Sequence, residues 1–159
     1  MHILDIESGQ EIQVEIVSGV TRDMPLKKDG WNFNWRSTLR RKGTRTYVLR
    51  KYLKPADIEG VVQLRESEGM LIMDLLEIAL HNIGTGKKKY ERVAGILIAF
   101  ACRESFRLEN NYKGFLTFYS KSELVELYKE KYGARQALGQ RMYIDPEVGI
   151  KLIREYLED

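Results

Sequence analysis

The sequence predicts an α/β (α+β) domain with a mixed, mostly antiparallel central sheet flanked by helices. Before residue 80, apolar and β-branched segments read as strands, and turn residues join several of them closely, which favours antiparallel pairing. From residue 70 onward, strands alternate with helical segments, and such a strand–helix–strand unit favours a parallel pair. The length of 159 residues is that of one domain, so a single domain over 1–159 is expected.

The first half of the chain contains four predicted strands and one insert. Glu11–Val17 alternates polar and apolar residues, as a half-buried strand does. Residues 18–43 lack a clear periodicity and form an irregular insert, in which Asn34–Lys42 is a candidate short helix. The other three predicted strands are Thr44–Tyr52, Ile58–Arg65 and Met70–Leu80.

The second half alternates helices with short strands. Val93–Phe106 is so apolar that a helix there must be covered on most sides. A short strand is expected over Gly114–Tyr119. Ser120 and Glu123 have the spacing of a capping box, which predicts a helix after them that ends at Gly133.

The C-terminal segment returns to the sheet and then ends in a helix. One or two short strands are expected over Gln136–Ile144. Asp145 is a suitable N-cap for the last helix and Pro146 a suitable first residue, because proline needs no hydrogen bond there.

Composition excludes several classes of protein. The single cysteine, Cys102, excludes a disulfide framework, and two histidines, His2 and His81, exclude a histidine-rich metal site, so no metal is expected. No apolar run has the length of a membrane helix, and the N-terminus lacks the cationic start of a secretory signal. We therefore expect a cytoplasmic protein with no membrane partner.

Positive charge is concentrated in one stretch, although the net charge is only +3. Residues 30–56 contain no acidic residue and eight basic ones, interleaved with aromatic residues. This pattern predicts a surface that attracts anions. It is also the mixture found where bases of single-stranded nucleic acid stack on aromatic rings. A third interpretation is a solvated face whose aromatic residues point inward.

The loop after the strand Met70–Leu80 is rich in glycine and lysine and leads into the apolar helix. A helix N-terminus has unpaired N–H groups and the positive end of the helix dipole, so it binds phosphate well. The residues therefore point to a phosphorylated cofactor or a nucleotide. The glycine spacing of the P-loop and that of the dinucleotide fingerprint are both absent.

Around this loop the chain resembles the GCN5-related N-acetyltransferase superfamily. That family's acetyl-CoA loop reads Gln/Arg-x-x-Gly-x-Gly/Ala and opens a long apolar helix. Here Lys89 stands in place of the Gln/Arg, Arg92 replaces the middle glycine, and Ala94 fits the last position.

A second segment carries the same resemblance. Leu127-Tyr128, followed by Gly133, is similar to the family's Leu-Tyr-x-x-x-Gly-Phe, with one extra residue before the glycine. The matching stretch covers roughly 71–144.

The resemblance implies the family's fold and acetyl-CoA as a co-substrate, with an acetyl group transferred to an amine by direct attack. In the family, two neighbouring strands splay apart and the pantetheine arm binds between them. Here the first of these two strands would be Met70–Leu80, and the backbone groups of Leu76, Ile78 and Leu80 would bind the arm. The pyrophosphate would be held by Lys88, Lys89, Arg92, Val93, Ala94 and Gly95, with Arg92 paired directly to phosphate.

Two residues are candidates for the proton transfers. Glu77 lies in an apolar strand, where burial makes a carboxylate a better proton acceptor, so it is the candidate base; a structural ion pair is the alternative. Asp74 and His81 are its fallbacks. Tyr128 matches the family's tyrosine and would protonate the departing CoA thiolate, unless it serves only in packing.

The acceptor is expected to be a small-molecule or peptide amine bound by the insert. Its candidate ligands are Trp31, Phe33, Trp35 and Arg36. Two alternatives stay open, a CoA-binding protein without activity and a nucleic-acid-binding module that uses the stretch from Arg36 to Lys54. The sequence also leaves open a homodimer.

Overall fold

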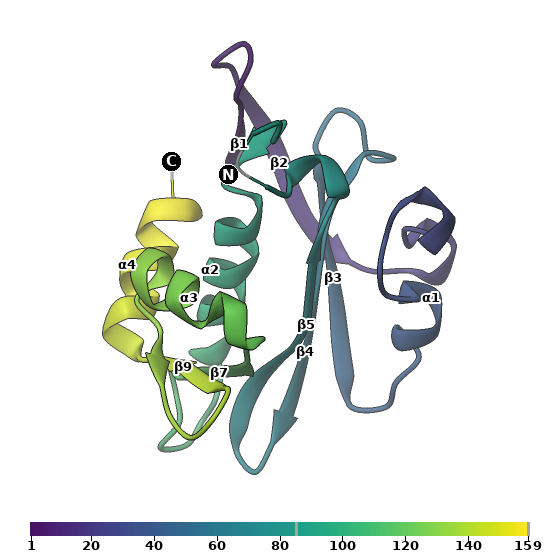
Figure 1. Ribbon diagram of the computed structural model, residues 1–159. Coiled ribbons are helices and arrows are strands. Elements are labelled where there is room, and N and C mark those ends of the chain that lie inside the picture. The colour runs from purple at the N-terminus through teal and green to yellow at the C-terminus, as the bar shows by residue number, and fades with distance from the viewer. Residues whose placement is uncertain (85, 159) are drawn as a thin grey trace.

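The computed structural model describes residues 1–84 and 86–158, which contain one nine-stranded mixed sheet (Figure 1). The strand order is β6-β1-β2-β3-β4-β5-β7-β9-β8. The strands are β1 (His2–Asp5), β2 (Glu11–Ser18), β3 (Thr44–Lys51), β4 (Ile58–Ser67), β5 (Met70–Ile78), β6 (Tyr90–Glu91), β7 (Leu116–Tyr119), β8 (Arg135–Gln136) and β9 (Arg141–Ile144).

Each neighbouring pair in this sheet is antiparallel except β5 with β7, which is parallel. Short turns connect β3, β4 and β5, whereas a helix carries the chain from β5 across to β7. The predicted fold class is therefore confirmed. The outermost strand β6 and its neighbour β1 were not predicted, since each is short and lacks a run of alternating residues.

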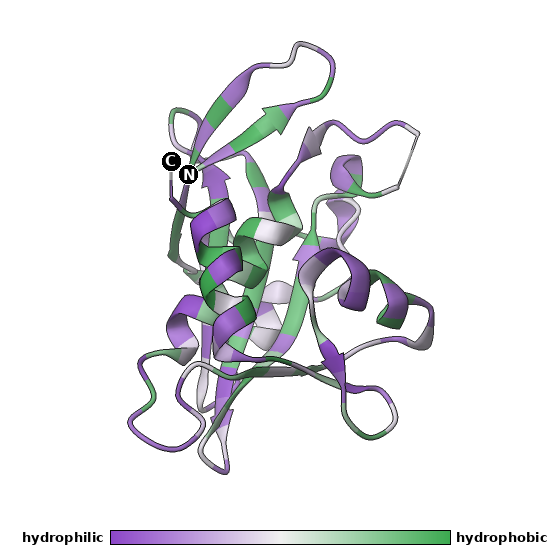
Figure 2. Cartoon of the chain, turned by 90° about the vertical axis from the view of Figure 1, so that its left-hand side faces the viewer, coloured by the Kyte–Doolittle hydropathy of each residue, from purple (hydrophilic) through white to green (hydrophobic). Residues whose placement is uncertain are grey.

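Three helices cover one face of the sheet and the insert covers part of the other (Figure 1). The helices are α2 (Val93–Ser105), α3 (Val125–Tyr132) and α4 (Pro146–Tyr156). The main core lies under them, and α2 is buried within it along almost its whole length. In contrast, α4 packs on the outer side of α2 and has both apolar and polar residues, as an amphipathic surface helix does (Figure 2).

The insert packs on the opposite face around a second, smaller core. It contains two 3-10 turns and one short helix, α1 (Trp35–Thr38). Met24, Trp31 and Trp35 pack there against Val48 and other side chains of β3 and β4. The insert thus has little regular structure but its own apolar anchor on the sheet.

The N-termini of the two C-terminal helices, α3 and α4, only partly match the prediction. Asp145 caps α4 as expected, because its Oδ1 accepts a hydrogen bond from the N–H of Val148 at 2.9 Å. The capping box at Ser120 is wrong, since its hydroxyl donates to the carbonyl of Lys121 instead. A 3-10 turn over Ser122–Leu124 precedes α3, so the helix starts later than the box predicts.

Within residues 1–84 and 86–158, no helix combines the length and the hydropathy of a membrane span. In the same part of the chain, no three metal-ligating side chains gather into a group that could hold an ion.

Candidate functional site

An opening in the sheet lies between β5 and β7. The two strands pair only through Leu71 with Leu116 and Ile72 with Thr117. Beyond Ile72, β5 runs on to Ile78 while paired only with β4, and β7 pairs only with β9. The backbone groups of 73–78 that face β7 therefore have no strand partner and are free to bind a ligand.

A β-bulge explains why the strands part there. Gln63 pairs with Leu75 but Leu64 pairs with Met73, so Asp74 is an extra residue on β5. A bulge bends its strand and increases the local twist. Because the bulge comes two residues after Ile72, the last residue paired with β7, it turns the rest of β5 away from that strand.

The N-terminus of α2 provides free backbone donors next to this opening. The N–H groups of Val93, Ala94 and Gly95 belong to the first turn and have no partner within the helix. The residue before them, Arg92, has a left-handed backbone with a φ of 82° and gives no side-chain cap. It thus adopts the conformation that a glycine adopts readily, at the position of the family's middle glycine.

A cavity of about 390 Å³ lies in front of these donors. Its walls come from the end of β5, the start of α2 and the last turns of α3 and α4. The lining includes Ile78, Asn82, Lys88, Tyr90, Glu91, Arg92, Val93, Ala94, Gly95, Lys131, Tyr132, Glu155 and Tyr156. Free N–H groups at a helix N-terminus and the side chains of Lys88 and Lys131 fit a diphosphate, which the acidic Glu91 and Glu155 of the lining oppose only in part.

The structure brings most of the predicted acetyl-CoA ligands together. Ile78, Lys88 and Arg92–Gly95 line the cavity. Leu76 lies on the same face of β5 as Ile78 and packs against the main core. These positions are consistent with the predicted site, whose binding function stays a prediction.

Two other predicted ligands, Leu80 and Lys89, do not line the cavity. Leu80 is not in β5, which ends at Ile78; its side chain is 66% exposed and its carbonyl accepts the N–H of Ile83 in a 3-10 turn. Lys89 is outside the cavity lining, and its ammonium lies 5.3 Å from the ring centre of Tyr90.

The guanidinium of Arg92 binds backbone carbonyls, which does not support the predicted direct pairing with phosphate. Its guanidinium donates to the carbonyl of His2 at 3.1 Å and to those of Glu155 and Tyr156 at 3.0 and 3.5 Å. The last carbonyls of a helix attract cations because they lack partners within the helix. Arg92 therefore ties β1 and the end of α4 to the start of α2.

Gly95 allows the end of α4 to lie this close. A Cβ at position 95 would be 2.2 Å from Cε1 of Tyr156, well inside contact distance. The aromatic ring of Tyr156 thus lies directly on the backbone of α2 and forms a wall of the cavity.

Glu77 is not placed as a free base, which corrects the prediction. Its carboxylate is buried and accepts three hydrogen bonds from the insert, from Nε1 of Trp35 at 2.8 Å and from the backbone N–H groups of Asn32 and Phe33. The three N–H donors occupy three of the roughly four lone-pair sites of a carboxylate, so Glu77 has at most one site left for an acceptor amine. Glu77 instead fastens the insert to β5.

The fallback bases are also engaged. The two oxygens of Asp74 accept from Nε and Nη2 of Arg65 at 2.8 and 3.2 Å. Nε2 of His81 lies 2.6 Å from Oε1 of Glu59, a buried side chain that also accepts from Asn82.

The predicted acceptor ligands are divided between the core and the surface. Trp31 and Trp35 are buried in the smaller core, so neither can contact an acceptor or stack on a nucleic-acid base. Phe33 and Arg36 are exposed on the insert and remain candidates. The two tryptophans were misassigned because the sequence of a mixed aromatic and basic segment does not show whether its aromatic rings face the core or the solvent.

Tyr128 is placed beside the opening. Its ring packs 4.8 Å from that of Phe118, which follows the last β7 residue paired with β5. Burial raises the pKa of Tyr128 above its usual value, so the hydroxyl keeps its proton. No hydrogen bond among the described residues uses that hydroxyl, and no buried side-chain polar atom there lacks a partner, so the hydroxyl reaches solvent.

Comparison with known proteins finds similarity in structure only. No protein-family model matches the sequence, and no curated protein sequence matches it. Among solved structures, AtaTR bound with AcCoA is 14% identical, has a TM-score of 0.62 and is matched over 88% of this chain and 98% of that one.

Two further solved structures give similar values. A variant of the spermidine N-acetyltransferase SpeG from Vibrio cholerae is 19% identical with a TM-score of 0.60, over 87% of this chain and 96% of that one. A KacTA–DNA complex is 12% identical with a TM-score of 0.61, over 90% and 99%. At these identities, the similarity establishes a shared fold.

Proposed function

We propose that this chain, which has the fold of the GCN5-related N-acetyltransferases, transfers an acetyl group from acetyl-CoA to an amine. The observation that carries the proposal is the position of the cavity at the start of α2, directly beside the unpaired edge of β5. A diphosphate would occupy the cavity, and an extended arm would run along that edge. The similarity to structures of an acetyltransferase and of a protein bound with AcCoA supports the same conclusion.

The chain's own groups suffice to hold such a co-substrate. The N–H groups of Val93, Ala94 and Gly95 would bind phosphate oxygens, with Lys88 and Lys131 nearby. The backbone of 73–78 would bind the amides of the arm as an added strand. Arg92 contributes indirectly, because it holds the end of α4 and the wall that Tyr156 forms.

In the reaction, the lone pair of a neutral amine attacks the thioester carbonyl carbon, and the carbon–sulfur bond breaks. The sulfur leaves with the electron pair of that bond and takes a proton from Tyr128, whose raised pKa keeps the hydroxyl protonated. Tyr128 then regains a proton from solvent. The nitrogen loses its extra proton to solvent, because Glu77 is occupied by the insert.

Binding is tested by thermal unfolding with and without acetyl-CoA. A ligand that binds only the native state raises the midpoint temperature by mass action. At 100 times its Kd it adds about 2.7 kcal/mol to the free energy of unfolding. The matched control is pantetheine, which lacks the nucleotide and the diphosphate and should give a much smaller shift. An unchanged midpoint with saturating acetyl-CoA would exclude the proposal.

Activity is tested by the release of free CoA thiol in the presence of amines. If acetyl-CoA binds but no amine releases CoA, the chain is a CoA-binding protein without activity. A nucleic-acid-binding module would instead bind oligonucleotides with an affinity that falls steeply with salt.

A further inference from the structure

One face of the sheet near the opening is not covered by helices and carries arginines. Arg65 pairs with Ile72, and Ile72 pairs with Thr117, so these residues form one row across β4, β5 and β7. Their side chains point away from α2, because alternate neighbours such as Leu64 and Leu116 belong to the core beneath that helix. The row lies where β5 and β7 make their last pair.

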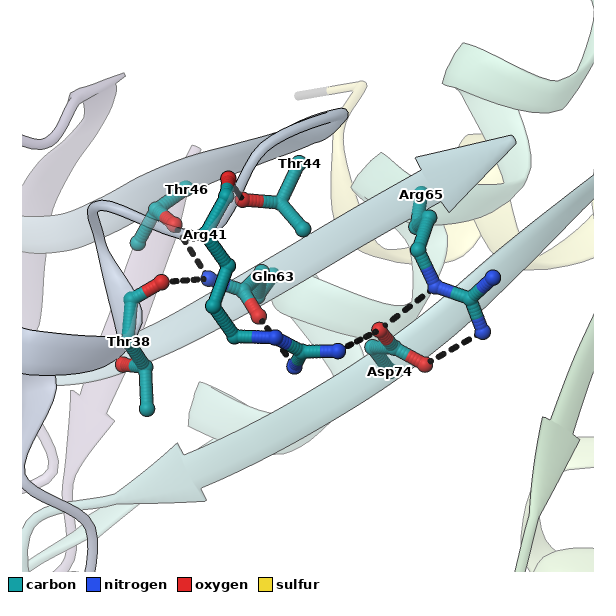
Figure 3. A network of polar contacts seen from close by, with 7 residues as sticks. All are labelled: Thr38, Arg41, Thr44, Thr46, Gln63, Arg65 and Asp74. Carbon is teal, nitrogen blue, oxygen red and sulfur yellow. Dashed lines mark hydrogen bonds and ion pairs between the residues drawn. The ribbon is translucent and has the colours of Figure 1, made fainter. Parts of the chain in front are cut away.

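Two arginines share one carboxylate on this face (Figure 3). Asp74 is held by Arg65 through two hydrogen bonds, and Nη2 of Arg41 lies 3.3 Å from its Oδ2. Arg41 also donates to Gln63. One carboxylate neutralises only one of the two guanidinium groups, so the cluster carries a net positive charge.

A third arginine adds to this charge from β9. Nε of Arg141 donates to the hydroxyl of Thr117 at 3.4 Å, and its Nη2 lies 3.3 Å from the sulfur of Met70. Within residues 1–84 and 86–158, no carboxylate lies within ion-pair distance of Arg141. Its guanidinium therefore lies over the start of β5 and the last paired residue of β7 with its charge unpaired.

The acceptor must approach through this face. From Ile78, where the cavity touches β5, back to the bulge at Asp74 is four residues, or about 13 Å of strand. An arm that follows the free edge over that length brings its acetyl end to the bulge. Because α2 and α3 cover the other face, the open side at this point is the one with Arg65 and Arg141.

Resting on the function proposed above, we propose that the acceptor is an amine that also carries an anionic group, a carboxylate or a phosphate. The anion binds Arg141, and the net positive charge of Arg41 and Arg65 around Asp74 attracts it to this face. A guanidinium presents two parallel N–H donors that match either anion. The same charges repel a polycation. This chain is therefore expected to differ from SpeG, which is a spermidine N-acetyltransferase.

The test is CoA release with matched pairs of amines. Ethanolamine is compared with phosphoethanolamine, and 4-aminobutanol with 4-aminobutanoate. Each pair is compared at equal concentrations of the unprotonated amino group, and spermidine serves as the polycation. We expect kcat/KM to be about tenfold or more higher for the anionic member of at least one pair, and lowest for spermidine. The pair that shows the preference identifies phosphate or carboxylate as the anion.

The variants Arg141→Gln and Arg45→Gln locate the effect. Arg45 is an exposed arginine of β3 that pairs with Glu66 away from this face, so it is the matched control. Arg141→Gln should reduce the ratio of anionic to neutral kcat/KM by about tenfold, and Arg45→Gln should leave the ratio unchanged.

The outcomes separate this inference from the function beneath it. Turnover of neutral amines or spermidine as fast as anionic ones, or a ratio that Arg141→Gln does not change, overturns the acceptor class and leaves the acetyltransferase intact. Absence of both acetyl-CoA binding and CoA release overturns the function itself.

Discussion

The carboxylate of Glu77 on β5 accepts a hydrogen bond from the indole Nε1 of Trp35 at 2.8 Å, and this contact joins the insert to the sheet beside the opening. The same carboxylate accepts the backbone N–H groups of Asn32 and Phe33, so three donors of the insert converge on one acid. Trp35 is fully buried and Glu77 is 7% exposed. The insert is thus fastened to β5 by an acid that the sequence suggested as a catalyst.

The variant Glu77→Gln tests this structural role. Glutamine keeps one acceptor oxygen but places an NH₂ group against N–H donors, so the free energy of unfolding should fall by about 2–3 kcal/mol. Urea unfolding measures the change, and the exposed Glu66→Gln is the control, with a change within about 0.5 kcal/mol. Unaltered stability combined with a collapse of kcat would restore Glu77 as the base.

Gly95→Ala should destabilise the fold because its new methyl group would collide with Tyr156. We expect a loss of about 1–3 kcal/mol as α4 moves away from α2, with weaker binding of acetyl-CoA. Gly149→Ala is the matched control within α4. Its Cβ would meet Cys102 at an ordinary 3.5 Å, so the helix should gain up to about 1 kcal/mol. Urea unfolding that ranks the two variants in the opposite order would contradict this packing.

Arg92 affects the stability of the fold both through its left-handed backbone and through its side chain, and two variants separate the two effects. Both Arg92→Gly and Arg92→Ala lose the hydrogen bonds to the carbonyls of His2, Glu155 and Tyr156. Only alanine also bears the cost of the left-handed backbone, so Arg92→Ala should be less stable than Arg92→Gly by about 1 kcal/mol. Chemical denaturation of both variants measures this difference, and equal stabilities would show that position 92 does not keep its positive φ.

Tyr128→Phe should reduce kcat for CoA release by about 10²-fold or more while leaving the fold unchanged. Phenylalanine keeps the packing against Phe118, and no hydrogen bond among the described residues is lost. Since the pKa of Tyr128 is raised, the wild-type rate should rise with pH as the acceptor amine becomes neutral, without a fall below pH of about 10. Tyr112→Phe is the control, because Tyr112 is exposed and lies outside the cavity lining. Equal turnover of Tyr128→Phe and wild type would remove Tyr128 as the acid.

Local patterns were sufficient for much of the fold. The strands from Glu11 to Ile78 and the helix from Val93 follow from alternation and from an unbroken apolar run, which depend on neighbours in sequence alone. Asp145 also needs only its own helix to act as a cap. The Ser120 capping box did not form, because a 3-10 turn begins at Ser122 and the Ser120 hydroxyl donates to the carbonyl of Lys121 instead of accepting a backbone N–H.

The sequence by itself determined the order of the longer strands and of the helices, together with the free N–H groups at the start of α2, because each of these arises within one segment. Only the tertiary structure decided what each polar side chain meets. Glu77 faces Trp35 across 42 positions and Arg92 reaches Glu155 across 63, and no local pattern encodes such contacts. Whether a buried acid can accept a proton, or an arginine can bind an anion, depends on the groups that folding brings within hydrogen-bond distance of it.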